Sequence, residues 1–158
     1  MPGDDPEGVI DAGGVNVVYG SPFGPSLAGI EHWHQNRTDT KDTAESYDLF
    51  GRALAAGDFD GDGIDEIVVP HQRGKQTSSM TILHNPKGLS WRQKRIHLPD
   101  YVTKPKSVQA GDINNDGRVD LVLSTEGADR NRSGIIWLSY VDRWDESNWV
   151  AHDISGPQ

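Results

Sequence analysis

Two Asp-rich segments of nearly the same pattern constrain this chain more than any other feature. The first, GDFDGDGIDEIVVP, runs from Gly57 to Pro70, and the second, GDINNDGRVDLVLS, runs from Gly111 to Ser124. In each, oxygen-bearing side chains alternate along a short loop, a glycine follows, and an apolar β-branched run comes soon after. Calcium prefers about six to eight oxygen ligands, and alternate residues of a tight loop can supply them. The pattern therefore predicts two calcium-binding loops, with Ca²⁺ as the cofactor.

The predicted ligands occupy positions 1, 3, 5, 7 and 9 of each loop. Position 6 is a glycine in both loops, because the chain must turn sharply there and a Cβ would obstruct it. Position 7 contributes its backbone carbonyl. The first site is predicted to use Asp58, Asp60, Asp62, the Ile64 carbonyl and Glu66. The second site is predicted to use Asp112, Asn114, Asp116, the Arg118 carbonyl and Asp120.

The residue at position 12 argues against an EF-hand. That motif closes its coordination with a bidentate Glu at position 12. Here the position holds Val69 in the first loop and Leu123 in the second, and neither side chain can bind a cation. The runs IVVP and LVLS have strand composition, and Pro70 would break an exiting helix. A dockerin also needs a helix after each loop and fails on the same ground. A plain Asp-Gly hairpin turn is the simpler alternative, but the match of two loops at five positions favours calcium.

The similarity between the two segments extends past the loops and defines a repeat. The spacing from Asp58 to Asp112 is 54 residues, and such periods are typical of repeat architectures. SMTILHN from Ser79 matches GIIWLSY from Gly134, and SWRQKRI matches NWVAHDI further on. Each unit therefore has one strand before the loop and three after it. Four antiparallel strands per repeat form the blade of a β-propeller.

The N-terminal segment corresponds to part of a third unit. GVNVVYG from Gly14 matches the second strand after a loop, and GIEHWHQ from Gly29 matches the third. We predict an all-β fold, a partial β-propeller of about two and a half four-stranded antiparallel blades with calcium-binding loops. The expected organisation is a tail at 1–12, the outer half of a blade with a connecting loop at 13–49, a blade with a calcium loop at 50–100, and a second such blade with a C-terminal turn at 101–158.

The segment LFGRALAAGDFDGDGIDEIVVP resembles the FG-GAP repeat of integrin alpha-subunit heads and of many bacterial surface proteins. Phe50-Gly51 stands for FG, and Val68-Val69-Pro70 stands for GAP. The unit at 50–100 is thus similar to an FG-GAP blade, and the unit at 101–158 is more similar to the related VCBS repeat. The resemblance implies calcium-braced propeller blades with each loop between the first two strands. It also implies an extracellular or cell-surface module that acts in binding, adhesion or scaffolding without catalysis.

Composition narrows the range of partners. The net charge of −9 argues against nucleic acid and anionic membranes, and no apolar run is long enough for membrane insertion. The N-terminus does not resemble a signal peptide. Because blades at the ends of a repeat array leave uncovered faces, we expect further propeller blades as partners, supplied by self-association or by a longer parent chain. The sequence also leaves open a protein or carbohydrate ligand.

Two other functions also stay open at this level. The chain could be part of a calcium-bearing propeller enzyme, such as a polysaccharide lyase, or a purely structural or designed propeller fragment. The sequence has no cysteine, no G-x-S-x-G and no P-loop, and the calcium pattern uses its main carboxylate clusters. No catalytic residue is therefore predicted.

Histidine and tryptophan residues outside the loops give weaker signals. His32 and His34 flank Trp33 and could coordinate a transition metal between them, although a polar strand face is the favoured interpretation. Trp144 lies in a loop and is the best candidate for an exposed ligand contact. The remaining histidines are expected at the surface: His71, His84, His97 and His152.

Overall fold

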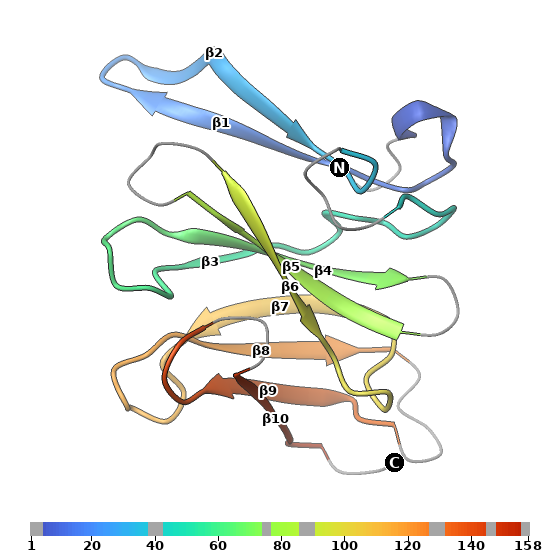
Figure 1. Ribbon diagram of the computed structural model, residues 1–158, viewed down its shortest axis with the longest axis vertical. Helices are drawn as coiled ribbons and strands as arrows, with labels where there is room; N and C mark the ends of the chain where they lie inside the picture. Colours follow the sequence, from blue (N-terminus) through green and yellow to red (C-terminus); the bar gives the residue numbers. More distant parts are fainter. Residues whose placement is uncertain are drawn as a thin grey trace.

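Three antiparallel β-sheets form the body of the protein and stack as layers (Figure 1). The computed structural model describes residues 5–37, 43–73, 77–85, 91–126, 132–144 and 148–155. Besides strands, these residues hold a short 3-10 helix, η1 (Pro6–Gly8). Within the same ranges, no helix has the length and apolar character needed to cross a membrane.

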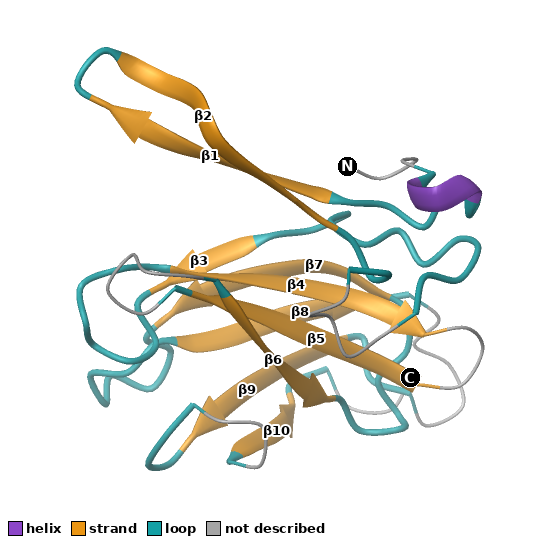
Figure 2. Cartoon of the chain, turned by 45° about the horizontal axis from the view of Figure 1, so that its top comes forward, coloured by secondary structure: helices purple, strands orange, loops and turns teal. Residues whose placement is uncertain are grey.

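The first sheet is a hairpin of two strands, β1 (Val15–Ser21) and β2 (Gly24–Trp33). Its register is interrupted between Val17 and Tyr19, and its distal end projects away from the other sheets (Figure 2). The two strands predicted at the N-terminus therefore pair with each other, as the outer half of a blade requires.

The other two sheets each have four strands in chain order. One contains β3 (Ala55–Gly57), β4 (Glu66–Arg73), β5 (Thr77–His84) and β6 (Arg92–His97). The other contains β7 (Pro105–Gly111), β8 (Asp120–Thr125), β9 (Ile135–Tyr140) and β10 (Trp149–Asp153). In both sheets the Asp-rich loop joins the first two strands, and both loops lie at the same edge of the molecule, on the left in Figure 1. The predicted all-β partial propeller is confirmed; we call these sheets the first and second blades.

Strand β4 is buried on both faces because a sheet lies on either side of it. Val68 contributes to a core between the two blades, together with Leu121 and Leu123 of β8. The neighbouring Val69 points to the opposite face and packs with Val15 in a core against the hairpin. Successive strand residues alternate between faces. A strand covered on both sides therefore reads as a continuous apolar run.

The Phe50-Gly51 pair lies where the hairpin meets the first blade. Phe50 is buried in the core against the hairpin and forms a parallel bridge with Gly13. Gly51 has φ +82, and a Cβ there would lie 2.6 Å from the Gly14 carbonyl oxygen. Only glycine combines this backbone conformation with so close an approach. We refer to this contact as the FG seam.

The outer face of the second blade lacks the cover that the first blade has. Four apolar residues of the first blade pack against the second blade and are fully buried: Val68, Met80, Ile82 and Ile96. Their counterparts in the second blade are Val122, Ile135, Trp137 and Ile154. Of these, Ile135 is 43% exposed and Ile154 is 55% exposed. We call these four residues the open face; in the described structure no third blade lies on it.

Candidate metal sites

In the first loop, the Asp58 carboxylate organises the turn. One of its oxygens accepts hydrogen bonds from the backbone N–H groups of Gly61 at 2.7 Å and Asp62 at 3.1 Å, and the other accepts one from Gly63 at 2.9 Å. Asp62 in turn accepts one from the Ile64 N–H at 2.9 Å. Oxygens of three predicted ligands, Asp58, Asp60 and Asp62, all lie within 4.8 Å of one another. The loop thus gathers carboxylates as the sequence predicted.

The second loop repeats this arrangement. The Asp112 carboxylate accepts hydrogen bonds from the backbone N–H groups of Asp116 at 3.0 Å and Gly117 at 2.9 Å. The Asp116 carboxylate accepts one from the Arg118 backbone N–H at 2.9 Å. Asn114 takes the place of Asp60, and its amide donates to the Asp116 carboxylate at 3.0 Å. Apart from the Gly61 N–H bond to Asp58, the backbone bonds of the first loop recur here one repeat later.

Both loops turn through left-handed residues at positions 4 and 6. These are Gly61 and Gly63 in the first loop, with φ of +77 and +87. In the second they are Asn115 and Gly117, with φ of +58 and +86. Glycine and asparagine adopt this region at low cost. The sequence pattern identified position 6 but missed position 4, where Gly and Asn share a conformation rather than a side chain.

The acid at position 9 closes each loop from the following strand. Glu66 accepts a hydrogen bond from the Phe59 N–H at 2.9 Å, and Asp120 accepts one from the Ile113 N–H at 3.1 Å. Both carboxylates are buried, with 0% of Glu66 and 1% of Asp120 exposed. The second oxygen of Asp120 has no hydrogen-bond partner within the described residues. A buried anionic oxygen without a partner is costly, and a cation in the loop would satisfy it.

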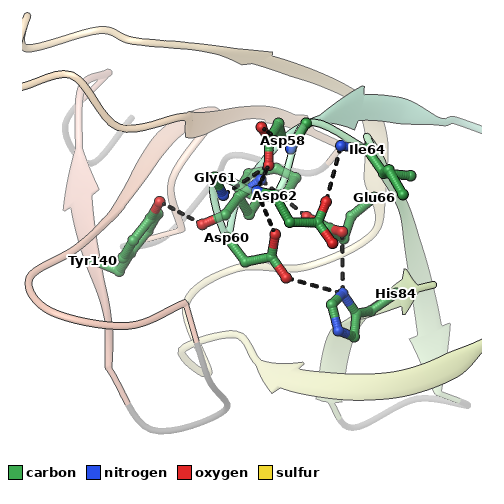
Figure 3. A network of polar contacts seen from close by, with 10 residues as sticks. Asp58, Asp60, Gly61, Asp62, Ile64, Glu66, His84 and Tyr140 are labelled. Carbon is green, nitrogen blue, oxygen red and sulfur yellow. Dashed lines mark hydrogen bonds and ion pairs between the residues drawn. The ribbon is translucent and has the colours of Figure 1, made fainter. Parts of the chain in front are cut away.

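Glu66 uses its longer side chain to reach a residue that the sequence did not connect with the loop. His84, at the end of β5, has its Nδ1 3.1 Å from the Glu66 oxygen that Phe59 does not bind and 3.6 Å from an Asp60 oxygen (Figure 3). Burial raises the pKa of the Glu66 carboxyl above its ordinary value, and the His84 contact opposes that rise. The expectation that His84 lies at the surface was therefore wrong.

Several other residues also differ from expectation. Trp144 is only 7% exposed, since it packs against His84 with ring centroids 4.9 Å apart and lies under the Lys94 ammonium. It is thus an interblade packing residue and not an exposed ligand contact. His71 is buried, and its Nε2 lies 3.1 Å from the Thr81 hydroxyl. Both residues lie between packed layers, which sequence periodicity alone does not indicate.

The pair His32 and His34 stays close together, with ring centroids 5.4 Å apart. His32 Nδ1 lies 2.8 Å from the Asn16 amide oxygen. No group of three metal-binding side chains that includes this pair occurs in the described parts of the chain. The polar-face interpretation therefore accounts for the pair.

A cavity of about 490 Å³ lies between the two loops. Asp60 lines it from the first loop and Arg118 from the second, while Lys94, Tyr140 and Trp144 form other parts of its wall. The cavity gives solvent and small ions a path to the Asp60 carboxylate.

Calcium fits the donor set of both loops. The first offers four carboxylates and the second three, with one amide oxygen, and hard oxygen donors in a tight loop suit this cation. The unpartnered Asp120 oxygen adds a specific acceptor that is already desolvated. The structure brings Asp58, Asp60 and Asp62 together in the first loop, whereas Glu66 groups with Asp60 and His84. Among the described residues, the acids of the second loop form no equally close group, and calcium binding at both sites stays a prediction.

Comparison with known proteins places the repeat in a family. Residues 58–123, which include both loops, match the FG-GAP-like repeat family. The chain is 32% identical over 125 residues to integrin alpha pat-2 of Caenorhabditis elegans, an alignment that covers 72% of this chain and 9% of that protein. It is 34% identical over 126 residues to integrin alpha pat-2 of Caenorhabditis briggsae, covering 68% of this chain and 10% of that protein.

The chain thus spans about a tenth of the length of the relatives that it matches. The matched region contains β4, β5 and β6 of the first blade, both Asp-rich loops and the start of the second blade. The matches and the two four-stranded blades together show that the chain belongs to the FG-GAP-like repeat family.

Proposed function

We propose that this chain is a calcium-binding β-propeller module that acts in adhesion or as a scaffold outside the cell, without catalytic activity. The observation that carries the proposal is the hydrogen bonding that the two loops share. In both, carboxylates at positions 1 and 5 fold the backbone around themselves, and a buried acid at position 9 closes the loop. The module would hold one ion in each loop.

Calcium would stabilise the fold by relieving repulsion among these carboxylates. Like charges held within a few ångströms destabilise the metal-free protein, and an ion that binds only the folded loop adds stability by mass action. The gain is about 2.7 kcal/mol per site at a hundredfold excess over the dissociation constant. Free calcium outside cells is high enough for weak multi-carboxylate sites to be filled.

The adhesion role rests on the similarity to integrin alpha proteins. The open face supports the proposal that further propeller blades are partners of this module. Screens for hydrolase or lyase activity on polysaccharides and esters should give no turnover. Robust turnover abolished by one substitution outside the loops would overturn the non-catalytic assignment.

The test of calcium binding is calorimetry and melting on the full chain. Two ions should bind the wild type, and EDTA should lower its melting temperature. Asp62→Ala and Asp116→Ala should each remove one ion and bring the melting temperature in calcium toward the chelated value. Asp100→Ala, an exposed acid outside both loops, serves as the matched control and should keep both ions. If calorimetry detects no calcium and EDTA leaves melting unchanged, the loops are only Asp-Gly turns.

A further inference from the structure

We infer that the first blade carries a transition-metal site formed by His84, Glu66 and Asp60. One ligating atom from each of these side chains lies within 4.8 Å of the other two. The site shares Glu66 and Asp60 with the proposed calcium loop, but it does not depend on calcium binding there. Its distinguishing ligand is the imidazole, which comes from β5 and not from the loop (Figure 3).

The spacing of the donor atoms fits a small divalent ion. His84 Nδ1 is 3.1 Å from the Glu66 oxygen and 3.6 Å from the Asp60 oxygen. Two ligands bound about 2.1 Å from a tetrahedral zinc lie about 3.4 Å apart, and the two observed distances bracket this value. The ion would bind the Nδ1 lone pair of the neutral tautomer that carries its proton on Nε2. Three protein ligands would leave a fourth position for water.

The chemistry of the donor set separates this site from a calcium site. Calcium in proteins takes oxygen ligands, whereas imidazole suits zinc, copper, iron and nickel. The burial of its ligands also distinguishes this site from the exposed part of the loop. Glu66 is fully buried, the His84 side chain is 12% exposed, and Trp144 packs on the imidazole ring. Such packing fixes the ring in place, and pre-organised ligands favour binding. Asp60 faces the cavity, which gives the ion an entry path.

The second blade provides an internal comparison. The residue at the position of His84 is Ser139, whose hydroxyl lies 2.9 Å from His152 Nε2 and not against the loop acid. The second loop therefore offers only oxygen ligands. A transition metal should bind the first blade selectively and compete there with calcium for Glu66 and Asp60.

Cobalt and zinc on the metal-free full chain provide the test. Co²⁺ added to the metal-free chain should give a visible d–d absorption band that saturates at one equivalent, and Zn²⁺ should bind the same chain in calorimetry. Zn²⁺ added to the calcium-loaded chain should displace one of the two calcium ions. His84→Ser, which installs the residue of the second blade, should weaken both by about tenfold or more and leave calcium binding to two sites. His97→Ser, an exposed histidine on β6, should change nothing.

The outcomes separate this site from the calcium proposal. Zinc and cobalt affinities that are the same in wild type and His84→Ser would overturn the transition-metal site, whatever calcium does. Dependence on His84 without any calcium binding would uphold the site and overturn the proposed calcium function. If circular dichroism shows that His84→Ser does not fold, Asp60→Asn is the second variant, because it removes a ligand carboxylate that is less buried than Glu66. Asp60→Asn should then lose zinc and cobalt affinity by the same factor, and unchanged affinities would overturn the site.

Discussion

The Tyr140 hydroxyl donates a hydrogen bond of 3.0 Å to the backbone carbonyl of Phe59, joining the end of β9 in the second blade to the loop of the first. Phe59 is also the residue whose N–H binds the Glu66 carboxylate. Its ring packs in the core between the blades. Phe59, at position 2 of the first loop, is thus held by the Glu66 carboxylate on one side and by the neighbouring blade on the other.

Removing the Tyr140 hydroxyl tests this connection. Tyr140→Phe should lower the free energy of unfolding by about 1 kcal/mol, because the buried Phe59 carbonyl loses its partner. Urea denaturation in calcium measures the change. Tyr47→Phe is the control, since Tyr47 is 66% exposed and its hydroxyl should contribute within about 0.5 kcal/mol. Equal effects of the two substitutions would contradict a stabilising role for the interblade bond.

Adding a carboxylate to the second loop should have opposite effects with and without calcium. Asn114→Asp gives this loop four ligand carboxylates, as in the first, and should tighten its calcium affinity several-fold because affinity rises with ligand charge. In EDTA the same change should lower the melting temperature, because the amide that donates to Asp116 becomes a repelling anion. Melting curves in both conditions check this; a decrease in both would argue against an ion at Asn114.

Gly51 should tolerate no side chain. Gly51→Ala combines a left-handed backbone, which costs an L-residue about 1–2 kcal/mol, with a Cβ only 2.6 Å from the Gly14 oxygen. We expect a loss above about 2 kcal/mol in the free energy of unfolding. Gly8→Ala is the matched control, with φ +80 and open space around its Cβ. It should show the backbone cost alone, and an equal loss in both variants would exclude a role for the close approach.

Lys106 should set the pKa of Glu126. A hydrogen bond and the charge of Lys106 lower the pKa of this exposed carboxyl below its ordinary value. The favourable contact is therefore present above the unfolded-state pKa and is lost as pH falls through the lower, folded-state pKa. An NMR titration should show the Glu126 pKa rising in Lys106→Ala. Lys104→Ala should raise it less, because Lys104 acts only through its more distant charge; a larger rise in that variant would contradict the assignment.

The open face predicts association between copies of the chain. Exposed apolar residues on a sheet face, at positions that the first blade buries, invite packing by another blade. Light scattering should show species above the monomer mass, and Ile135→Lys with Ile154→Asp should shift them toward monomer. Exposed Val141, outside the open face, is the control site for an equivalent Lys substitution. A stable wild-type monomer at high concentration would contradict this prediction.

Much of the fold could be predicted because the same pattern of strands and loop occurs twice in the sequence. The alignment of SMTILHN with GIIWLSY assigned β5 and β9, and the loop pattern assigned the strand pairs on either side of it. The burial of each strand face was harder to anticipate. Ile96 and Ile154 occupy matching positions, yet Ile96 is 2% exposed and Ile154 is 55% exposed. The difference depends on which neighbour is present, and a strand's own sequence does not contain that information.

The candidate metal sites show the same limit. The predicted loop ligands follow from local spacing, so Asp58 and Asp112 could be proposed from the sequence alone. His84 is 18 residues from Glu66 along the chain, and only the register of β4 against β5 brings it to the loop. Trp144 comes from the other blade to cover it. Contacts that depend on strand pairing and blade packing require the three-dimensional structure.

The FG seam limits where the repeats can be separated from one another. Phe50 and Gly51 open the sequence unit of the first blade, but they also contact Gly13, Gly14 and Val15 at the start of the hairpin. The core around Phe50 therefore spans two successive sequence units, so a truncation at residue 50 would cut through it.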